Sequence, residues 1–193
     1  MSIWPEEDTK VLAPGEAEFD TVDMTLNIGP AHPATHGVFR MVLTVDGEVV
    51  VGCEPYIGYL HRGLEKLSEN NDYRQAMGYW DRTDYLAGMA CEVAYCMAVE
   101  KLGGIEVPER AEYIRVIMTE LSRLNSHFMF LGAFGQDVGS FGTTFTWAWR
   151  ERERIYDLME EVAGDRMFPT YIRPGGVSMD LPENFEPRCR WVL

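Results

Sequence analysis

The chain has 193 residues, enough for one hydrophobic core or for a large domain with a smaller one beside it. Hydrophobic residues make up 46% and charged residues 25% of the sequence, which is ordinary for a folded globular protein and does not indicate disorder. The 17 basic and 31 acidic side chains give a formal charge of -14. This balance argues against a nucleic-acid-binding protein, because such proteins carry a basic surface.

No stretch of the sequence reaches the roughly 18–20 apolar residues that a membrane-spanning helix needs. The best candidate, Leu86 to Val99, is shorter and is interrupted by Glu92. The first residues lack the basic and then apolar pattern of a signal peptide. Four scattered cysteines are too few for a disulfide framework, which favours a reducing, cytoplasmic setting. Any association with a membrane is therefore expected to come through a partner.

Three parts are predicted along the chain. Residues 1–22 form an acidic, poorly ordered lead-in, residues 23–60 a small β-sheet domain, and residues 61–193 a helical bundle domain that is incomplete at its C-terminus. A strand is expected over Met24–Ile28, where polar and apolar residues alternate. Together these parts predict an α+β fold, with an antiparallel sheet packed on the bundle.

A β-hairpin is predicted within the sheet domain. Val38 to Val45 and Glu48 to Cys53 are rich in residues that favour strands, and they flank a two-residue Asp46-Gly47 turn. Such a turn is expected to hold both of its central residues at positive φ, which ties the two strands together in antiparallel order.

Helical patterns follow. Asp84 to Lys101 is apolar on most sides, as expected for a helix buried in a bundle. Pro108 begins a second helix, because proline in a first turn lacks only an N–H that would be unpaired there. Apolar residues then recur at steps of three and four, namely Ile114, Ile117, Leu121, Leu124 and Phe128. A third helix is predicted from about Thr144 to Val162. A glycine-rich turn carrying Asp137 is expected between the second and third helices.

The most unusual stretch is Gly29–Gly37, which holds His32 and His36 four residues apart. On a helix this spacing suits zinc, but Pro30 and Pro33 exclude a regular helix, and we expect no metal site. Two interpretations remain: the histidines tie the loop together, or a rigid loop presents an imidazole into a cavity. Histidine suits the second role because its pKa near 6.5 allows proton delivery at neutral pH.

A second polar cluster, Tyr79–Tyr85, is expected at the start of the first long helix. Its acidic residues have an ordinary structural explanation, since carboxylates in a first turn balance the helix dipole. Tyr85 needs a hydrogen-bond partner if it is buried, and a buried Arg82 needs an acceptor or an opposite charge. Spacing alone therefore marks candidates without defining a function.

Six stretches, taken in order, resemble the quinone-site D subunit (the 49-kDa type) of proton-translocating NADH:quinone oxidoreductase, respiratory complex I. They are Leu26–Gly37, Gly58–Lys66, Asp81–Tyr85, Ala98–Leu102, Glu120–Leu124 and Tyr171–Val177. The resemblance runs from about Asp20 to the last residue and covers the N-terminal half of the family's polypeptide. It is specific, because all six stretches stand at the family's spacing.

The resemblance implies a site for quinone reduction. His36 and Tyr85 would contact the two ends of the quinone headgroup, and Asp137 would pair with His36. His32 and Arg82 are assigned to cofactor binding, with Arg82 beside the terminal iron–sulfur cluster of the neighbouring B subunit. The quinone, either ubiquinone or menaquinone, would be a substrate, and no cofactor would be bound covalently to this chain.

The same resemblance implies an enzyme component that is active only within its complex. Its partners would be subunits B and C, other peripheral-arm subunits and the membrane arm, with no nucleic acid. It would lie on the cytoplasmic face of the cell membrane, where electron transfer from NADH to quinone is coupled to proton translocation. The implied fold is related to that of nickel–iron hydrogenase large subunits.

Some alternatives remain. Many family members carry a histidine shortly before Tyr171, where this chain has Phe168, which predicts a cluster potential that changes little with pH. A hydrogenase is disfavoured, because Asp84 and Ala87 stand where nickel-binding thiolates would be needed. Two rivals stay open: a reduced deazaflavin or ferredoxin as the electron source, or a scaffold in which the histidines and Tyr85 only stabilise the fold.

Overall fold

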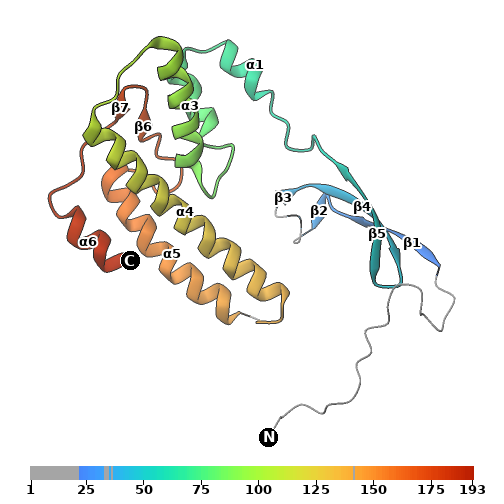
Figure 1. The fold of residues 1–193 in the computed structure, drawn as a ribbon. Coiled ribbons are helices and arrows are strands. Elements are labelled where there is room, and N and C mark those ends of the chain that lie inside the picture. Colours follow the sequence, from blue (N-terminus) through green and yellow to red (C-terminus); the bar gives the residue numbers. More distant parts are fainter. Residues whose placement is uncertain (1–21, 33–34, 36, 141) are drawn as a thin grey trace, which may run out of the picture. The chain divides into compact units, whose positions relative to one another are not determined.

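The computed structural model describes residues 22–32, 35, 37–140 and 142–193 (Figure 1). The predicted lead-in therefore lies outside the described residues, apart from Val22. The structure divides the chain into two units, Met1–Arg62 and Gly63–Leu193, each of which is described by itself. Antiparallel strands dominate the first unit and helices the second, so the expected α+β class is confirmed. The strands of the first unit are β1 (Asp23–Ile28), β2 (Ala31–His32), β3 (Gly37–Val38), β4 (Arg40–Asp46) and β5 (Val49–Tyr56).

Three of these strands form an antiparallel sheet in the order β1-β4-β5. The predicted hairpin is present, but its turn lies one residue later than expected. Asp46 still pairs with Val49, so Gly47 and Glu48 form the turn, and of these two only Gly47 has a positive φ, at 61°. A bulge follows, because Val45 pairs with Val50 whereas Thr44 pairs with Gly52.

The short strands β2 and β3 pair with each other, with His32 opposite Gly37. The Thr35 hydroxyl lies 2.7 Å from the carbonyl oxygen of His32 and 3.0 Å from that of Gly37. Gly29, just before β2, has a φ of 85° and lies so close to Phe39 that a Cβ there would stand 1.8 Å from the Phe39 carbonyl oxygen. Only glycine fits at this position.

The second unit is built on helices, joined by one short β-hairpin. Its elements are α1 (Leu64–Glu69), α2 (Tyr73–Trp80), α3 (Gly88–Gly103), α4 (Glu109–Asp137), α5 (Thr143–Ala163), β6 (Ile172–Arg173), β7 (Gly176–Val177) and α6 (Phe185–Val192). The expected helices after Pro108 and from Thr144 are confirmed; the first begins at Glu109 and the second ends against Gly164, which has a φ of 80°.

The longest helices, α4 and α5, pack antiparallel along most of their length (Figure 1). The glycine-rich stretch near residue 135 was expected to form a turn after α4, but it remains helical up to Asp137. Its glycines serve packing instead: a Cβ at Gly135 would lie 2.7 Å from the Thr144 side chain, and one at Gly132 would lie 3.2 Å from the Phe145 ring. The absence of side chains there lets α5 approach closely.

The core of this unit lies where α3, α4 and α5 meet the β6–β7 hairpin. Its most deeply buried apolar side chains are Met89, Cys96, Met118, Ile155, Leu158, Val162, Tyr171 and Ile172. The hairpin therefore belongs to the core. Because one residue of each strand is buried, the two short strands of the hairpin are stabilised by the core.

One buried ion pair holds the hairpin to two helices. Arg115 of α4 donates to both carboxylate oxygens of Glu100 on α3, at 2.5 and 3.1 Å. The same guanidinium donates to the carbonyl oxygens of Arg173 (2.7 Å) and Gly176 (2.9 and 3.0 Å), while the Gly175 amide donates to Glu100 (2.8 Å). Burial raises the pKa of Glu100, but the bonds from Arg115 and Gly175 outweigh it and hold that pKa below its ordinary value.

We predict that Arg115→Met destabilises the chain by about 3–5 kcal/mol, because Glu100 would be left as an unpaired buried charge and two carbonyl groups would lose their donor. Urea unfolding measures the loss. Arg123→Met is the matched control on the same helix, since Arg123 forms an exposed pair with Glu120 that contributes little. Equal midpoints for the two variants would contradict the assigned role of Arg115.

Candidate functional site

Two of the candidate residues, Arg82 and Tyr85, lie on the connection between α2 and α3. This segment was expected to begin a helix at Asp84, but α3 begins only at Gly88. The Asp84 carboxylate accepts the N–H groups of Leu86 (3.0 Å) and Ala87 (3.3 Å), which stabilises a turn in place of a helix. Tyr85 therefore stands on a turn and not on a helix.

The connection begins at a fully buried carboxylate. Asp81 has no exposed surface, and its oxygens accept from Arg82 (2.8 Å) and from the Thr170 hydroxyl (3.1 Å). Burial raises the pKa of Asp81, while Arg82 and Thr170 act in the opposite direction. A Cβ at Gly88 would lie 2.7 Å from the Asp81 carbonyl oxygen, so α3 starts directly against this group.

The Arg82 side chain makes three contacts within the unit and stays partly exposed. Its guanidinium donates to the Gly78 carbonyl oxygen at 2.6 Å as well as to Asp81, and it lies 4.8 Å from the centre of the Phe168 ring. The side chain is still 45% exposed. A cation fixed on a carboxylate and an aromatic face, with part of its surface free, can bind an electron-rich group from outside.

A second buried carboxylate, Glu92 of α3, lies within electrostatic reach of Asp81. Its side chain is 1% exposed; one oxygen accepts the Ile172 N–H at 2.9 Å, and the other has no hydrogen-bond partner among the described residues. Burial raises the pKa of Glu92 to about 7, with the Asp81 charge adding to the shift and the backbone N–H groups near Ile172 opposing it. Glu92 can therefore hold a proton near neutral pH.

Tyr85 is 47% exposed, and its other side borders a small cavity of about 10 Å³ inside the bundle. That volume approaches what a single water molecule needs. Ser122, Asn125 and Tyr156 also line this cavity, and the buried side-chain oxygen of Asn125 has no partner among the described residues. Tyr85 thus connects the surface of the unit with a polar spot in its interior.

The remaining candidates lie elsewhere. Asp137 is the last residue of α4 and is exposed, twelve residues beyond Asn125 and so about 18 Å further along the helix axis. His32 lies in β2 of the first unit. His36 lies outside the described residues. The structure thus brings Arg82 and Tyr85 together on one connection, and it does not bring Asp137 to the cavity beside Tyr85.

Asp81, Glu92 and Thr170 were not predicted as site residues. The sequence did carry one signal, because Glu92 interrupts an otherwise apolar stretch, and a buried carboxyl group usually has a specific role. Thr170 carried no signal: its φ of 44° is rare outside glycine, and its contact with Asp81 joins residues far apart in the sequence.

Within the described ranges, no three His, Cys, Asp or Glu side chains gather closely enough to hold a metal ion. None of the helices in those ranges is both long and apolar enough to cross a membrane. The four cysteines are unpaired, and the buried one, Cys96, lies with its sulfur 3.4 Å from the Ile172 carbonyl oxygen.

Comparison with known proteins identifies the family. A family model described as the 49 Kd subunit of respiratory-chain NADH dehydrogenase matches residues 137–193. The protein of Clostridium beijerinckii named as the D subunit of NADH-quinone oxidoreductase is 55% identical over 178 residues, which are 92% of this chain and 48% of that relative. Proteins of the same name are 54% identical in Desulforamulus reducens (88% of this chain, 46% of the relative) and 52% identical in Carboxydothermus hydrogenoformans (90% and 47%).

The chain belongs to the family of the NADH-quinone oxidoreductase D subunit, as its six sequence stretches predicted. It spans about half the length of the curated relatives it matches.

We predict that the stability of the chain falls as the pH rises from about 5 to 8, and that Glu92→Gln removes most of this fall. The folded-state pKa near 7 exceeds the unfolded value of 4.5, so the folded form binds the extra proton and loses that advantage as the pH rises through 7. The difference between the two proteins should approach about 3 kcal/mol at pH 8.

Urea midpoints at a series of pH values test this, because glutamine keeps the acceptor for the Ile172 N–H but cannot ionise. Parallel pH profiles for the two proteins would show that ionisation of Glu92 does not destabilise the fold, which would contradict the prediction.

Proposed function

We propose that this chain forms part of the quinone-reduction site of a proton-translocating NADH:quinone oxidoreductase. The observation that carries the proposal is the α2–α3 connection in a member of the D-subunit family. It presents a half-exposed tyrosine and a half-exposed, carboxylate-held arginine only three positions apart, above two buried carboxyl groups. Relatives named for quinone oxidoreduction support the assignment to this reaction.

Reduction of a quinone to a quinol consumes two electrons and two protons. Tyr85 would donate a hydrogen bond to one quinone oxygen and supply one proton from its phenol group. His36 would supply the other proton as an imidazolium, with Asp137 raising its pKa, and His32 would take part in cofactor binding. Glu92 is a nearby group that can exchange a proton close to neutral pH.

The electrons would come from an iron–sulfur cluster held by the neighbouring B subunit, and Arg82 is the residue of this chain that fits beside it. Its guanidinium is fixed by Asp81 and Phe168 while part of its surface stays open. A fixed positive charge near such a cluster favours the reduced form. Phe168 adds no titrating group, which is why a weak pH dependence of the cluster potential was expected. Glu92, whose pKa is raised to about 7, is a source of pH dependence that this expectation did not include.

In this proposal the chain acts only within a complex, with subunits B and C, the other peripheral-arm subunits and the membrane arm as partners. It lies on the cytoplasmic face of the membrane, and NADH is the electron source. Loss of protons from Tyr85, His36 or Asp137 changes the charge at the site, which is the event proposed to be coupled to proton translocation. A fold related to nickel–iron hydrogenase large subunits is part of the same proposal.

We expect Tyr85→Phe and His36→Ala to slow NADH-driven quinone reduction in membranes by about 10²-fold or more, because each removes a positioned proton donor. Each variant is assayed with a quinone and with an artificial oxidant that accepts electrons before the quinone site. The expected result is loss of quinone reduction with the upstream reaction intact. A fall in both activities would indicate failed assembly of the complex.

The matched control is Tyr113→Phe, an exposed tyrosine on α4 that does not line the cavity beside Tyr85. It should leave both reactions unchanged. Full quinone reduction in Tyr85→Phe and His36→Ala would favour the scaffold interpretation and remove these residues from the site. Replacing NADH by reduced ferredoxin as the donor, with the same membranes, distinguishes the rival electron source.

A further inference from the structure

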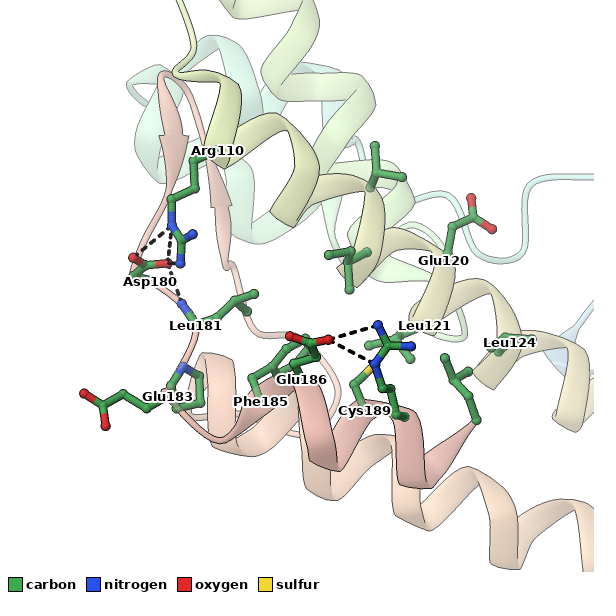
Figure 2. A pocket seen from close by; sticks show the side chains of 15 residues that line it. Arg110, Glu120, Leu121, Leu124, Asp180, Leu181, Glu183, Phe185, Glu186 and Cys189 are labelled. Atoms are coloured by element: carbon green, nitrogen blue, oxygen red, sulfur yellow. Dashed lines mark hydrogen bonds and ion pairs between the residues drawn. The ribbon is translucent and has the colours of Figure 1, made fainter.

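Two cavities of the second unit differ in how their polar groups are satisfied. The larger is a groove of about 880 Å³ between α4 and the C-terminal segment (Figure 2). The charged groups at its edge are paired: Arg110 binds Asp180 at 2.9 Å. Likewise, Arg190 binds Glu186 at 2.9 Å. The smaller cavity, beside the α2–α3 connection, is lined by Asn125, whose buried side-chain oxygen has no partner among the described residues. Such an oxygen is costly unless a donor reaches it.

We propose that this small cavity is the site of one ordered water molecule, which Asn125 and Ser122 hold beside Tyr85, and that Asn125 is thereby a positioning residue for Tyr85. This role rests on the proposed function, because it concerns the proton that Tyr85 would donate to the quinone. Asn125 was not among the candidates from the sequence, and it lies one residue beyond the stretch Glu120–Leu124 that carries part of the resemblance.

The polar groups at the cavity come from three separate elements. Ser122 and Asn125 are three positions apart on α4, which places them on the same face of that helix. Both are buried, with 3% and 2% of their surface exposed. Tyr85 lines the cavity from the α2–α3 connection and Tyr156 lines it from α5. A buried water usually makes about three hydrogen bonds, so these side chains are enough to hold one.

The size of the cavity limits its occupant. Its volume of about 10 Å³ is close to what one water molecule needs, and it excludes a larger ligand. Cavities that stay dry are lined by apolar groups, whereas this one has an unsatisfied oxygen in its wall. The rest of the lining includes the apolar side chains of Met89, Met159 and Met167, so the water depends on a few polar groups.

Among those polar groups, Asn125 is the one whose need is unmet. The Tyr156 hydroxyl accepts a hydrogen bond from Arg152. Arg166, which also lines the cavity, donates to three carboxylates of α5. The side-chain oxygen of Asn125 has no donor among the described residues. A water molecule supplies that donor and still has a second O–H group for another partner.

A water fixed by Asn125 acts on the step in which Tyr85 donates its proton. The O–H bond of Tyr85 breaks, the proton moves to a quinone oxygen, and a phenolate remains. The water donates a hydrogen bond to this phenolate and is not consumed. Hydrogen bonds to a charged acceptor are about twice as strong as those between neutral groups, so the water stabilises the phenolate more than the resting phenol. It therefore speeds proton transfer and leaves quinone binding unchanged.

The test uses membranes that contain the assembled complex, with the quinone and the upstream oxidant as acceptors. Asn125→Leu replaces the amide by an apolar side chain of similar size. It should lower kcat for quinone reduction about tenfold, because a hydrogen bond to a charged group is lost, with KM for quinone and the upstream reaction unchanged. Asn125→Ser keeps a hydroxyl group and should retain most of the rate.

The matched control is Thr119→Val, also on α4. It removes another buried oxygen that has no partner among the described residues, but Thr119 does not line the cavity, so both reactions should be unchanged. Ser122→Ala is a milder change at the second group that holds the water. It should lower kcat with KM unchanged, and it replaces Asn125→Leu as the test if that variant impairs assembly.

A double variant separates positioning from a general structural role. If Asn125 acts through Tyr85, Tyr85→Phe/Asn125→Leu should be no slower than Tyr85→Phe alone. A high-resolution structure of the assembled complex should show a water bonded to the Asn125 oxygen. The inference is overturned if Tyr85→Phe slows quinone reduction while Asn125→Leu does not, if the two effects multiply, or if that structure shows a dry cavity. Full quinone reduction in Tyr85→Phe would instead contradict the proposed function, and this inference with it.

Discussion

The buried pair between Arg115 and Glu100 is the interaction on which the rest of the second unit depends. One guanidinium satisfies a carboxylate on α3 and two carbonyl groups of the β6–β7 hairpin, so three elements distant in sequence are held at one point. The strand leading into that hairpin then places the Ile172 amide on Glu92 and the Thr170 hydroxyl on Asp81. The carboxylates below the α2–α3 connection therefore keep their partners only while the hairpin stays in place.

This arrangement places two carboxyl groups inside the unit, at Asp81 and Glu92, and one positive charge at the surface beside Asp81, at Arg82. Asp81 and Glu92 are both buried, the charge of Asp81 makes ionisation of Glu92 less favourable, and of these two only Asp81 has a directly bonded cation. Arg82 compensates part of that charge from the surface. A charged group that binds to the exposed side of Arg82 should therefore also change the pKa of Glu92, because the charges of Arg82, Asp81 and Glu92 are weakly screened where they are buried. Protonation of Glu92 is in this sense coupled to the charge of the exposed arginine.

Sequence patterns predicted the elements whose causes are local. The helix after Pro108, the helix from about Thr144 and the antiparallel hairpin were all confirmed, because periodicity and turn residues act over a few positions. The predictions at Asp84 and Gly135 were wrong for opposite reasons. Asp84 accepts hydrogen bonds from the backbone just after it and delays α3, while Gly135 stays helical and leaves room for Thr144 of another helix. Of the candidate site, sequence identified Arg82 and Tyr85, but the Asp81–Thr170 contact spans 89 residues and no local pattern could indicate it.

The α2–α3 connection has a consequence for variation in this family. Three local contacts fix its conformation. Arg82 bonds Asp81 at the start, Asp84 accepts a backbone N–H in the middle, and Gly88 lies against the Asp81 carbonyl group at the end. Inserting or deleting one residue would break at least one of these contacts. The spacing between the arginine and the tyrosine is therefore set by the chain itself, so we expect this interval of three positions to tolerate no insertion or deletion.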